Sequence, residues 1–132
     1  MKIKSLLIIA ISCLLYSCNN QKNVPNTDIE VARAFINDIL QNNFKEAEKL
    51  VLKEDTNEQF LEQFKEYESK SKESENYKNS DIIINEISPV NDSVTIINYS
   101  NSFKKDKSNK LKMVRVNGQW LVDLKYTFSG NM

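Results

Sequence analysis

The chain has 132 residues, of which 40% are apolar and 27% are charged, a composition typical of one globular domain. Basic and acidic residues balance at 18 each, so the bulk charge gives no sign of a nucleic-acid partner. The absence of histidine excludes serine–histidine and cysteine–histidine catalysis, as well as zinc sites built from cysteine and histidine. The sequence has no phosphate-binding P-loop, dinucleotide-binding glycine motif or EF-hand loop, so we expect neither a cofactor nor a metal.

A basic start followed by an apolar run marks the N-terminus. Lys2 and Lys4 precede the segment Leu6–Tyr16, which is shorter than the roughly 20 apolar residues that a membrane-spanning helix needs. This order is typical of a signal peptide. The segment leads into Leu15-Tyr16-Ser17-Cys18, which resembles the lipobox that the bacterial lipoprotein signal peptidase recognises. The rival Ala10-Ile11-Ser12-Cys13 would leave an apolar region of only about seven or eight residues, so we place the lipidated cysteine at Cys18.

The lipobox resemblance implies a membrane-anchored protein of the bacterial cell envelope. Residues 1–17 would be removed, and Cys18 would carry a diacylglyceryl group and an amide-linked acyl chain such as palmitate. More than one acyl chain anchors a protein stably, because each buried methylene contributes about 0.8 kcal/mol. Asn19 is not the aspartate that signals retention in the inner membrane, so we expect the periplasmic face of the outer membrane. Residues 18–26 are predicted to form a polar tether.

Three helices are predicted in the first half of the remaining chain. Thr27-Asp28-Ile29-Glu30 forms a capping box, and apolar residues at helical spacing follow it. Asn42-Asn43 ends this helix, and Asn43 can begin a second, shorter one. A second capping box, Thr56-Asn57-Glu58-Gln59, predicts the start of a third helix, whose apolar stripe lies within residues 60–67.

Charged residues four positions apart follow the stripe of the third helix. Glu66 and Lys70 form one predicted pair, and Glu68 and Lys72 form another, each worth a few tenths of a kcal/mol. Residues 69–80 are highly polar, and we expect the helix to fray there into a linker.

The second half of the chain has the pattern of an antiparallel sheet. Its residues are rich in isoleucine and valine, which favour strands. The turn before the second strand is placed at residues 89–92, and a polar loop is placed at residues 104–109. The four predicted strands cover residues 81–88, 93–103, 110–116 and 119–128.

Asn117-Gly118 is a strong signal for a two-residue hairpin turn, and such a turn fixes the register of the strands on either side. The register places side chains on alternate faces of the sheet, and the apolar face would be buried. Lys112 and Asp123 would form an ion pair on the other, exposed face. The predicted pairs are Val116 with Gln119, Arg115 with Trp120, Met113 with Val122, and Leu111 with Leu124.

The helix-first order, the Asn-Asn-Phe-Lys-Glu-Ala segment and the closing Val-Asn-Gly-Gln-Trp-Leu-Val-Asp-Leu hairpin resemble small nuclear transport factor 2-like (cystatin-like α+β) lipoprotein domains of unknown function. The resemblance implies an α+β fold over residues 27–130, with about three helices packed on a curved four-stranded antiparallel sheet. In that family the sheet forms a cone, which can hold a ligand, support a homodimer or be filled by side chains. No catalytic motif of the family has a match here.

Six residues are candidates for lining such a cone. Aromatic side chains at these positions can line a pocket or simply fill the core. Arg115 can fix an anionic ligand at the mouth of a pocket, or it can pack its stem on the indole of Trp120. The candidates are Phe35, Ile39, Tyr99, Arg115, Trp120 and Tyr126.

Only carboxylates remain available for acid/base chemistry. Asp38 and Glu86 have apolar neighbours in the sequence, but acidic residues are seldom fully buried, so we name no catalytic residue. We expect a non-catalytic module that binds a small apolar or amphipathic ligand or a protein partner. The alternatives are an accessory subunit with a filled core and an acid/base enzyme of the isomerase or dehydratase type. A cavity above about 300 Å³ would favour ligand binding, and a buried carboxylate with a strongly raised pKa would favour the enzyme.

Overall fold

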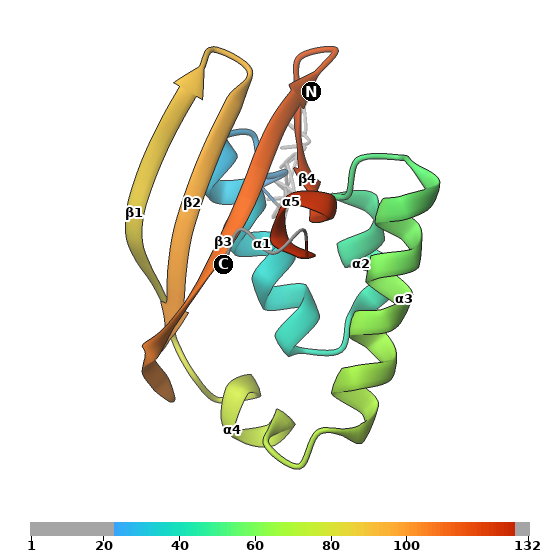
Figure 1. Cartoon of the computed structure of the whole chain (residues 1–132), viewed down its shortest axis with the longest axis vertical. Helices are drawn as coiled ribbons and strands as arrows, with labels where there is room; N and C mark the ends of the chain where they lie inside the picture. The colour runs from blue at the N-terminus through green and yellow to red at the C-terminus, as the bar shows by residue number, and fades with distance from the viewer. Residues whose placement is uncertain (1–22, 129–132) are drawn as a thin grey trace, which may run out of the picture.

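A computed structural model of the chain describes residues 23–128 (Figure 1). The expected signal peptide, both cysteines and most of the expected tether therefore lie outside the described residues. The described part is an α+β fold in which helices come first and a four-stranded antiparallel sheet follows, as the sequence predicts. Within residues 23–128, no helix has the length and apolar character needed to cross a membrane.

Helix α1 (Asp28–Leu40) begins at the predicted capping box. The backbone N–H of Glu30 donates to Thr27 Oγ1 over 3.2 Å, and the N–H of Thr27 donates to the Glu30 carboxylate over the same distance. Backbone hydrogen bonds from Asn26 and Thr27 lower the pKa of Glu30. Asn42 follows the helix with a φ of 59°, the left-handed conformation that commonly ends helices, which confirms the predicted stop.

Helices α2 (Phe44–Lys49), α3 (Asp55–Lys70) and α4 (Ser74–Lys78) follow α1. Asn43 occupies the predicted N-cap position of α2, although its side chain makes no cap hydrogen bond. The capping box predicted at residues 56–59 is wrong, because α3 begins two residues earlier and its N-cap, Glu54, makes no side-chain cap hydrogen bond. The predicted linker is also partly wrong, since α4 lies within it.

Asn57, which the sequence placed in a capping box, is fully buried and joins two distant segments. Its amide nitrogen donates to the carbonyl oxygen of Leu52 over 3.1 Å, and its Oδ1 accepts from the backbone N–H of Lys125 over 3.1 Å. These two bonds satisfy a buried polar side chain and hold the start of α3 against the C-terminal segment.

The sheet is a meander in the order β1-β2-β3-β4, and every neighbouring pair is antiparallel. Figure 1 shows its strands bending past α1, with α3 on the far side of that helix. The strands are β1 (Ile82–Asn91), β2 (Val94–Asn101), β3 (Lys104–Val116) and β4 (Gln119–Asp123).

Two predicted connections of the sheet are wrong. Strand β1 continues through Pro89 to Asn91, because β1 is an edge strand with a register shift at this point, where a residue without an N–H is tolerated. The predicted polar loop at residues 104–109 is the first half of β3, and it pairs with the end of β2. Polar residues suit this stretch because most of their side chains are exposed.

The hairpin between β3 and β4 confirms the predicted register, with Arg115 opposite Trp120 and Met113 opposite Val122. Gly118 has a φ of 79°, which a two-residue hairpin turn of this kind requires. The pairing of Leu111 with Leu124 is wrong, because β4 ends at Asp123.

Residues that were predicted as the end of β4 form a short helix, α5 (Leu124–Phe128). Thr127 Oγ1 donates to the carbonyl oxygen of Lys110 over 2.9 Å. This carbonyl belongs to the part of β3 that β4 is too short to pair with, so the Thr127 side chain supplies its hydrogen bond. Lys112 Nζ lies 3.3 Å from the carboxylate of Asp123, as predicted, but this carboxylate is 8% exposed rather than open to solvent.

The core lies between α1 and the inner face of the sheet. Helix α1 supplies five of its buried residues, and the strands supply side chains from the face predicted to be apolar. Trp120 is half-buried at its border. The buried apolar residues are Val31, Ala32, Phe35, Ile36, Ile39, Ala47, Val51, Leu61, Ile97, Leu111, Met113, Val122 and Leu124.

Candidate functional site

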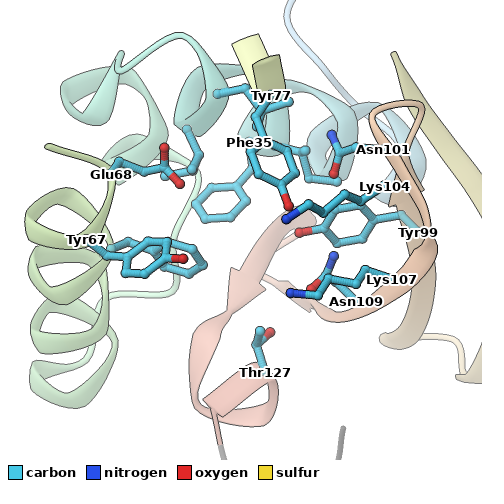
Figure 2. Close-up of a pocket in the computed structure, with 14 residues that line it drawn as sticks. Phe35, Tyr67, Glu68, Tyr77, Tyr99, Asn101, Lys104, Lys107, Asn109 and Thr127 are labelled. Carbon is cyan, nitrogen blue, oxygen red and sulfur yellow. The ribbon is translucent and has the colours of Figure 1, made fainter. Parts of the chain in front are cut away.

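A cavity of about 230 Å³ opens between the helices and one end of the sheet (Figure 2). Helices α1, α3 and α4 form one side, while β2, β3 and α5 form the other. Its lining residues are Phe35, Ile36, Ile39, Leu40, Phe64, Tyr67, Glu68, Tyr77, Tyr99, Asn101, Lys104, Lys107, Asn109 and Thr127. The volume is below the roughly 300 Å³ that would favour ligand binding over a filled core, so the size of the cavity does not separate the two alternatives, and only a small ligand would fit.

The cavity has apolar side chains from α1 and α3, one carboxylate on α3, Glu68, and mostly polar side chains along the sheet. The end of α1 and the middle of α3 present apolar side chains because their stripes at helical spacing face one another across the space. The end of β2 and the first half of β3 present asparagine and lysine instead. A ligand with one apolar and one polar part would match this arrangement.

Helix α4 is tied to β3 by an ion pair at the edge of the cavity. Lys104 Nζ lies 2.6 and 2.8 Å from the two carboxylate oxygens of Glu73, and this hydrogen bonding raises the pKa of Lys104. The rings of Tyr77 and Phe103 pack edge to face, with centroids 5.1 Å apart. Lys104 Nζ lies 5.9 Å from the Tyr77 centroid and 5.5 Å from the Phe103 centroid.

The hydroxyl groups of Tyr77 and Tyr99 and the amine of Lys104 point into the same part of the cavity (Figure 2). Burial raises the pKa of Tyr99 to about 12. Burial also raises the pKa of Tyr77, although the nearby Lys104 opposes the shift. Both phenols therefore remain protonated at neutral pH and can donate hydrogen bonds.

Among the residues that the structure describes, Glu68 is the only acidic one that lines the cavity, and it enters from α3. No salt bridge joins it to Lys72, so that predicted pair is wrong, whereas Lys70 Nζ lies 2.6 Å from Glu66 as predicted. Burial raises the pKa of Glu68. Figure 2 shows its carboxylate directed from the α3 wall into the cavity.

Three of the six residues predicted to line a pocket come together in this cavity. Phe35 and Ile39 enter from α1, and Tyr99 enters from β2. The other three, Arg115, Trp120 and Tyr126, are not among its lining residues.

Arg115 and Trp120 lie at the opposite end of β3 and β4. The guanidinium carbon of Arg115 lies 6.0 Å from the ring centroid of Trp120, and Arg115 is exposed. This geometry agrees with the interpretation in which the arginine packs on the indole while its charge stays in water.

The two carboxylates considered for acid/base chemistry also lie outside the cavity. Asp38 is half-buried on α1, where burial raises its pKa and a side-chain hydrogen bond with Asn43 opposes the shift. Glu86 is exposed on β1 and accepts a hydrogen bond from Ser88 Oγ over 3.1 Å. Within residues 23–128, no cluster of three acidic, histidine or cysteine side chains is placed to hold a metal ion.

Sequence reasoning missed most of the polar lining. Tyr77 was assigned to a linker, and Lys104, Lys107 and Asn109 were assigned to a solvated loop, because neither segment has an apolar pattern. Tyr77, the one aromatic residue within the polar residues 69–80, was the only signal in the sequence that this segment packs against the rest of the domain.

No family model, no curated protein and no solved structure matches the chain.

Proposed function

We propose that the chain is a lipid-anchored protein of the cell envelope whose folded domain binds a small amphipathic ligand without changing it chemically. The observation that carries the binding function is the cavity of about 230 Å³, which combines an apolar wall from α1 with charged and polar groups from α3 and the sheet. An engineered protein cavity of about 150 Å³ holds benzene, so this volume suits a ligand of roughly nine or ten non-hydrogen atoms.

The polar groups of the cavity suit binding better than catalysis. Lys104 is held by Glu73, so its amine stays protonated and has no role as a base. The pKa of Tyr99, raised to about 12, likewise keeps its phenol protonated at neutral pH. The chain has no histidine to supply a base in the neutral range.

The acid/base enzyme remains a second candidate because Glu68 lines the cavity and burial raises its pKa. An acid/base enzyme of this kind needs a buried carboxylate, and Glu68 is only half-buried. A general base also needs an acid or an electrophile across from it, and Lys104 is engaged with Glu73. We therefore favour a binding role for this carboxylate.

We further propose that the domain is nuclear transport factor 2-like. The helix-first order, the four-stranded antiparallel meander and the position of α1 against the sheet support this resemblance. In a domain of this family, the cavity would correspond to the open end of the cone that the sheet forms.

Native mass spectrometry tests the binding function. The full-length protein is extracted from membranes of its own host and sprayed under non-denaturing conditions. We expect a population whose added mass, beyond the lipid modification, is that of a small molecule released on unfolding. A protein that carries only its lipid modification would count against the binding function.

The anchor is tested by two cysteine variants. Cys18→Ser should abolish membrane partition, whereas Cys13→Ser should leave it intact, because only Cys18 is proposed to be lipidated. Release of both variants, or of neither, would contradict the assignment. Metabolic labelling with palmitate distinguishes acylation from retention of the signal peptide.

An accessory role with a protein partner is favoured by the edge of the sheet. Within the described residues, β1 pairs only with β2, and Ile87 and Val90 are 42% and 63% exposed. An unpaired edge with apolar side chains is suited to strand addition by another chain or by a second copy. Crosslinking from a photoreactive residue at Val90 in intact cells tests this alternative.

A further inference from the structure

We propose that the ligand of the cavity is a small organic ammonium ion, held by Glu68 and by the faces of the aromatic rings around it. This inference rests on the proposed binding function and specifies the charge of the ligand. The two observations behind it are a carboxylate in the cavity wall without a partner among the described residues, and five aromatic side chains in the lining.

Glu68 is placed to accept a positive charge from outside the chain. Within residues 23–128, its carboxylate forms no ion pair or hydrogen bond, while the neighbouring Glu66 is bonded to Lys70 over 2.6 Å. A half-buried carboxylate without a partner is costly, and burial raises its pKa accordingly. A cation bound in the cavity would supply the missing partner.

Aromatic rings line the cavity from four elements. A ring face attracts a cation that lies within about 6 Å of its centroid, and the attraction is stronger where water is excluded. The same fold already places Lys104 Nζ at 5.9 Å from the centroid of Tyr77. The five aromatic side chains of the lining are Phe35, Phe64, Tyr67, Tyr77 and Tyr99.

The lysines of the sheet wall do not exclude a cation from the α3 side. Lys104 is neutralised locally by Glu73, whose carboxylate oxygens lie 2.6 and 2.8 Å from its amine. Lys107 is exposed on β3, where solvent screens its charge. Figure 2 places Glu68 on the opposite side of the cavity from both lysines. The bound ammonium group therefore belongs beside α3.

Three probes of matched shape separate the charge of the ligand from its size. They are 2-phenylethylammonium, 2-phenylethanol and phenylacetate, each of about nine or ten non-hydrogen atoms, which suits the cavity volume. Binding is measured by calorimetry on the full-length lipoprotein in nanodiscs, with empty nanodiscs titrated as the blank. The variants are Glu68→Gln and, as a control on the same helix but outside the cavity, Glu66→Gln.

We expect 2-phenylethylammonium to bind about tenfold more tightly than 2-phenylethanol. Glu68→Gln should remove this preference but leave the affinity for 2-phenylethanol unchanged, which also shows that the variant is folded. Glu66→Gln should keep the preference.

Tighter binding of phenylacetate or 2-phenylethanol would overturn the ammonium proposal and leave the binding function standing. A preference for the ammonium probe that survives Glu68→Gln would also overturn it. If none of the three probes binds to the unaltered protein, both the ammonium ligand and the proposed binding function fail for ligands of this size.

Discussion

The two ends of the sheet are built differently. At one end lie the hairpin turns between β1 and β2 and between β3 and β4, and the adjoining inner face is closed by residues such as Met113 and Val122, which are fully buried. At the other end, β2 turns into β3 beside α4, and the space between sheet and helices stays open as the cavity.

The two ends differ in whether local or long-range interactions determine their structure. The closed end depends on short-range signals, above all the Asn117-Gly118 turn. The open end depends on contacts between residues far apart in sequence, such as Lys104 with Glu73 and the Gln41 side chain with the carbonyl oxygen of Lys78. The cavity, which is the proposed binding site, lies at the end of the sheet where the side chains pack least completely.

The largest expected effect is on the closed core. Leu111→Ala should lower the free energy of unfolding by about 3 kcal/mol, because Leu111 is 1% exposed and its removal leaves a void. Leu40→Ala, at the half-buried wall of the cavity, should cost only about 1 kcal/mol. Urea unfolding measures both. Equal losses would mean that the two ends are packed alike.

Asn57→Ala should be next in magnitude, lowering the free energy of unfolding by about 2 kcal/mol. The change leaves the carbonyl of Leu52 and the N–H of Lys125 without their buried partner. Thr56→Ala is the control, since Thr56 is exposed and is not the N-cap, and it should cost less than about 0.5 kcal/mol. A larger loss for Thr56→Ala would restore the capping box predicted from the sequence.

Gly118→Ala should lower the free energy of unfolding by about 1 kcal/mol, because alanine does not favour the backbone conformation at this position. Its φ of 79° is strained for alanine, whereas no atom lies within 4 Å of the added methyl carbon. Asn117 has a φ of 50°, which glycine also adopts readily. Asn117→Gly should therefore change the free energy of unfolding, measured by thermal denaturation, by less than about 0.5 kcal/mol. A steep loss at Asn117 would indicate that its side chain, rather than the turn geometry, stabilises the closed end.

The smallest expected effect is at the open end and depends on pH. The folded state raises the pKa of Glu68 above the ordinary value of 4.5, so the penalty on its ionised form is absent at lower pH and develops as pH rises through the folded pKa. Glu68→Gln should therefore raise Tm by about 1 °C at pH 7 and leave it unchanged at about pH 3.5.

The other titratable groups that line the cavity are the phenols of Tyr67, Tyr77 and Tyr99 and the amines of Lys104 and Lys107. Burial raises the pKa of Tyr77 and Tyr99, and the hydrogen bond with Glu73 raises the pKa of Lys104. Glu73 is bound to Lys104, so differential scanning calorimetry of Glu73→Gln separates the contribution of that ion pair. A Tm gain for Glu68→Gln that is the same at both pH values would show that the carboxylate is not penalised by burial.

The sequence predicted what is encoded within a few neighbouring residues. The capping box at Thr27 and the register of Arg115 with Trp120 are of this kind, because each is fixed by adjacent backbone and side-chain groups. Prediction from the sequence failed where contacts with residues distant in the chain override the local pattern of apolar and polar residues. The alternation from Leu124 to Phe128 is typical of a strand, yet Asn57 and Lys110 hold this segment as a helix.

The sequence predicted three apolar or aromatic residues of the candidate site, two on α1 and Tyr99 on β2, but none of its charged residues. Phe35 and Ile39 lie on the stripe of a helix, which periodicity detects. Glu68 and Lys104 have no such pattern, and their roles depend on whether a partner is present, which only the folded chain determines. The same limit explains why the predicted ion pair between Glu68 and Lys72 is wrong.

The distribution of aromatic residues gives the protein two separate optical reporters. Its single tryptophan, Trp120, is half-buried on β4, away from the residues that line the cavity. Three of its five tyrosines, Tyr67, Tyr77 and Tyr99, line the cavity itself. Tryptophan emission should therefore follow global unfolding, while tyrosine absorbance in the near ultraviolet should follow occupancy of the cavity in the same sample.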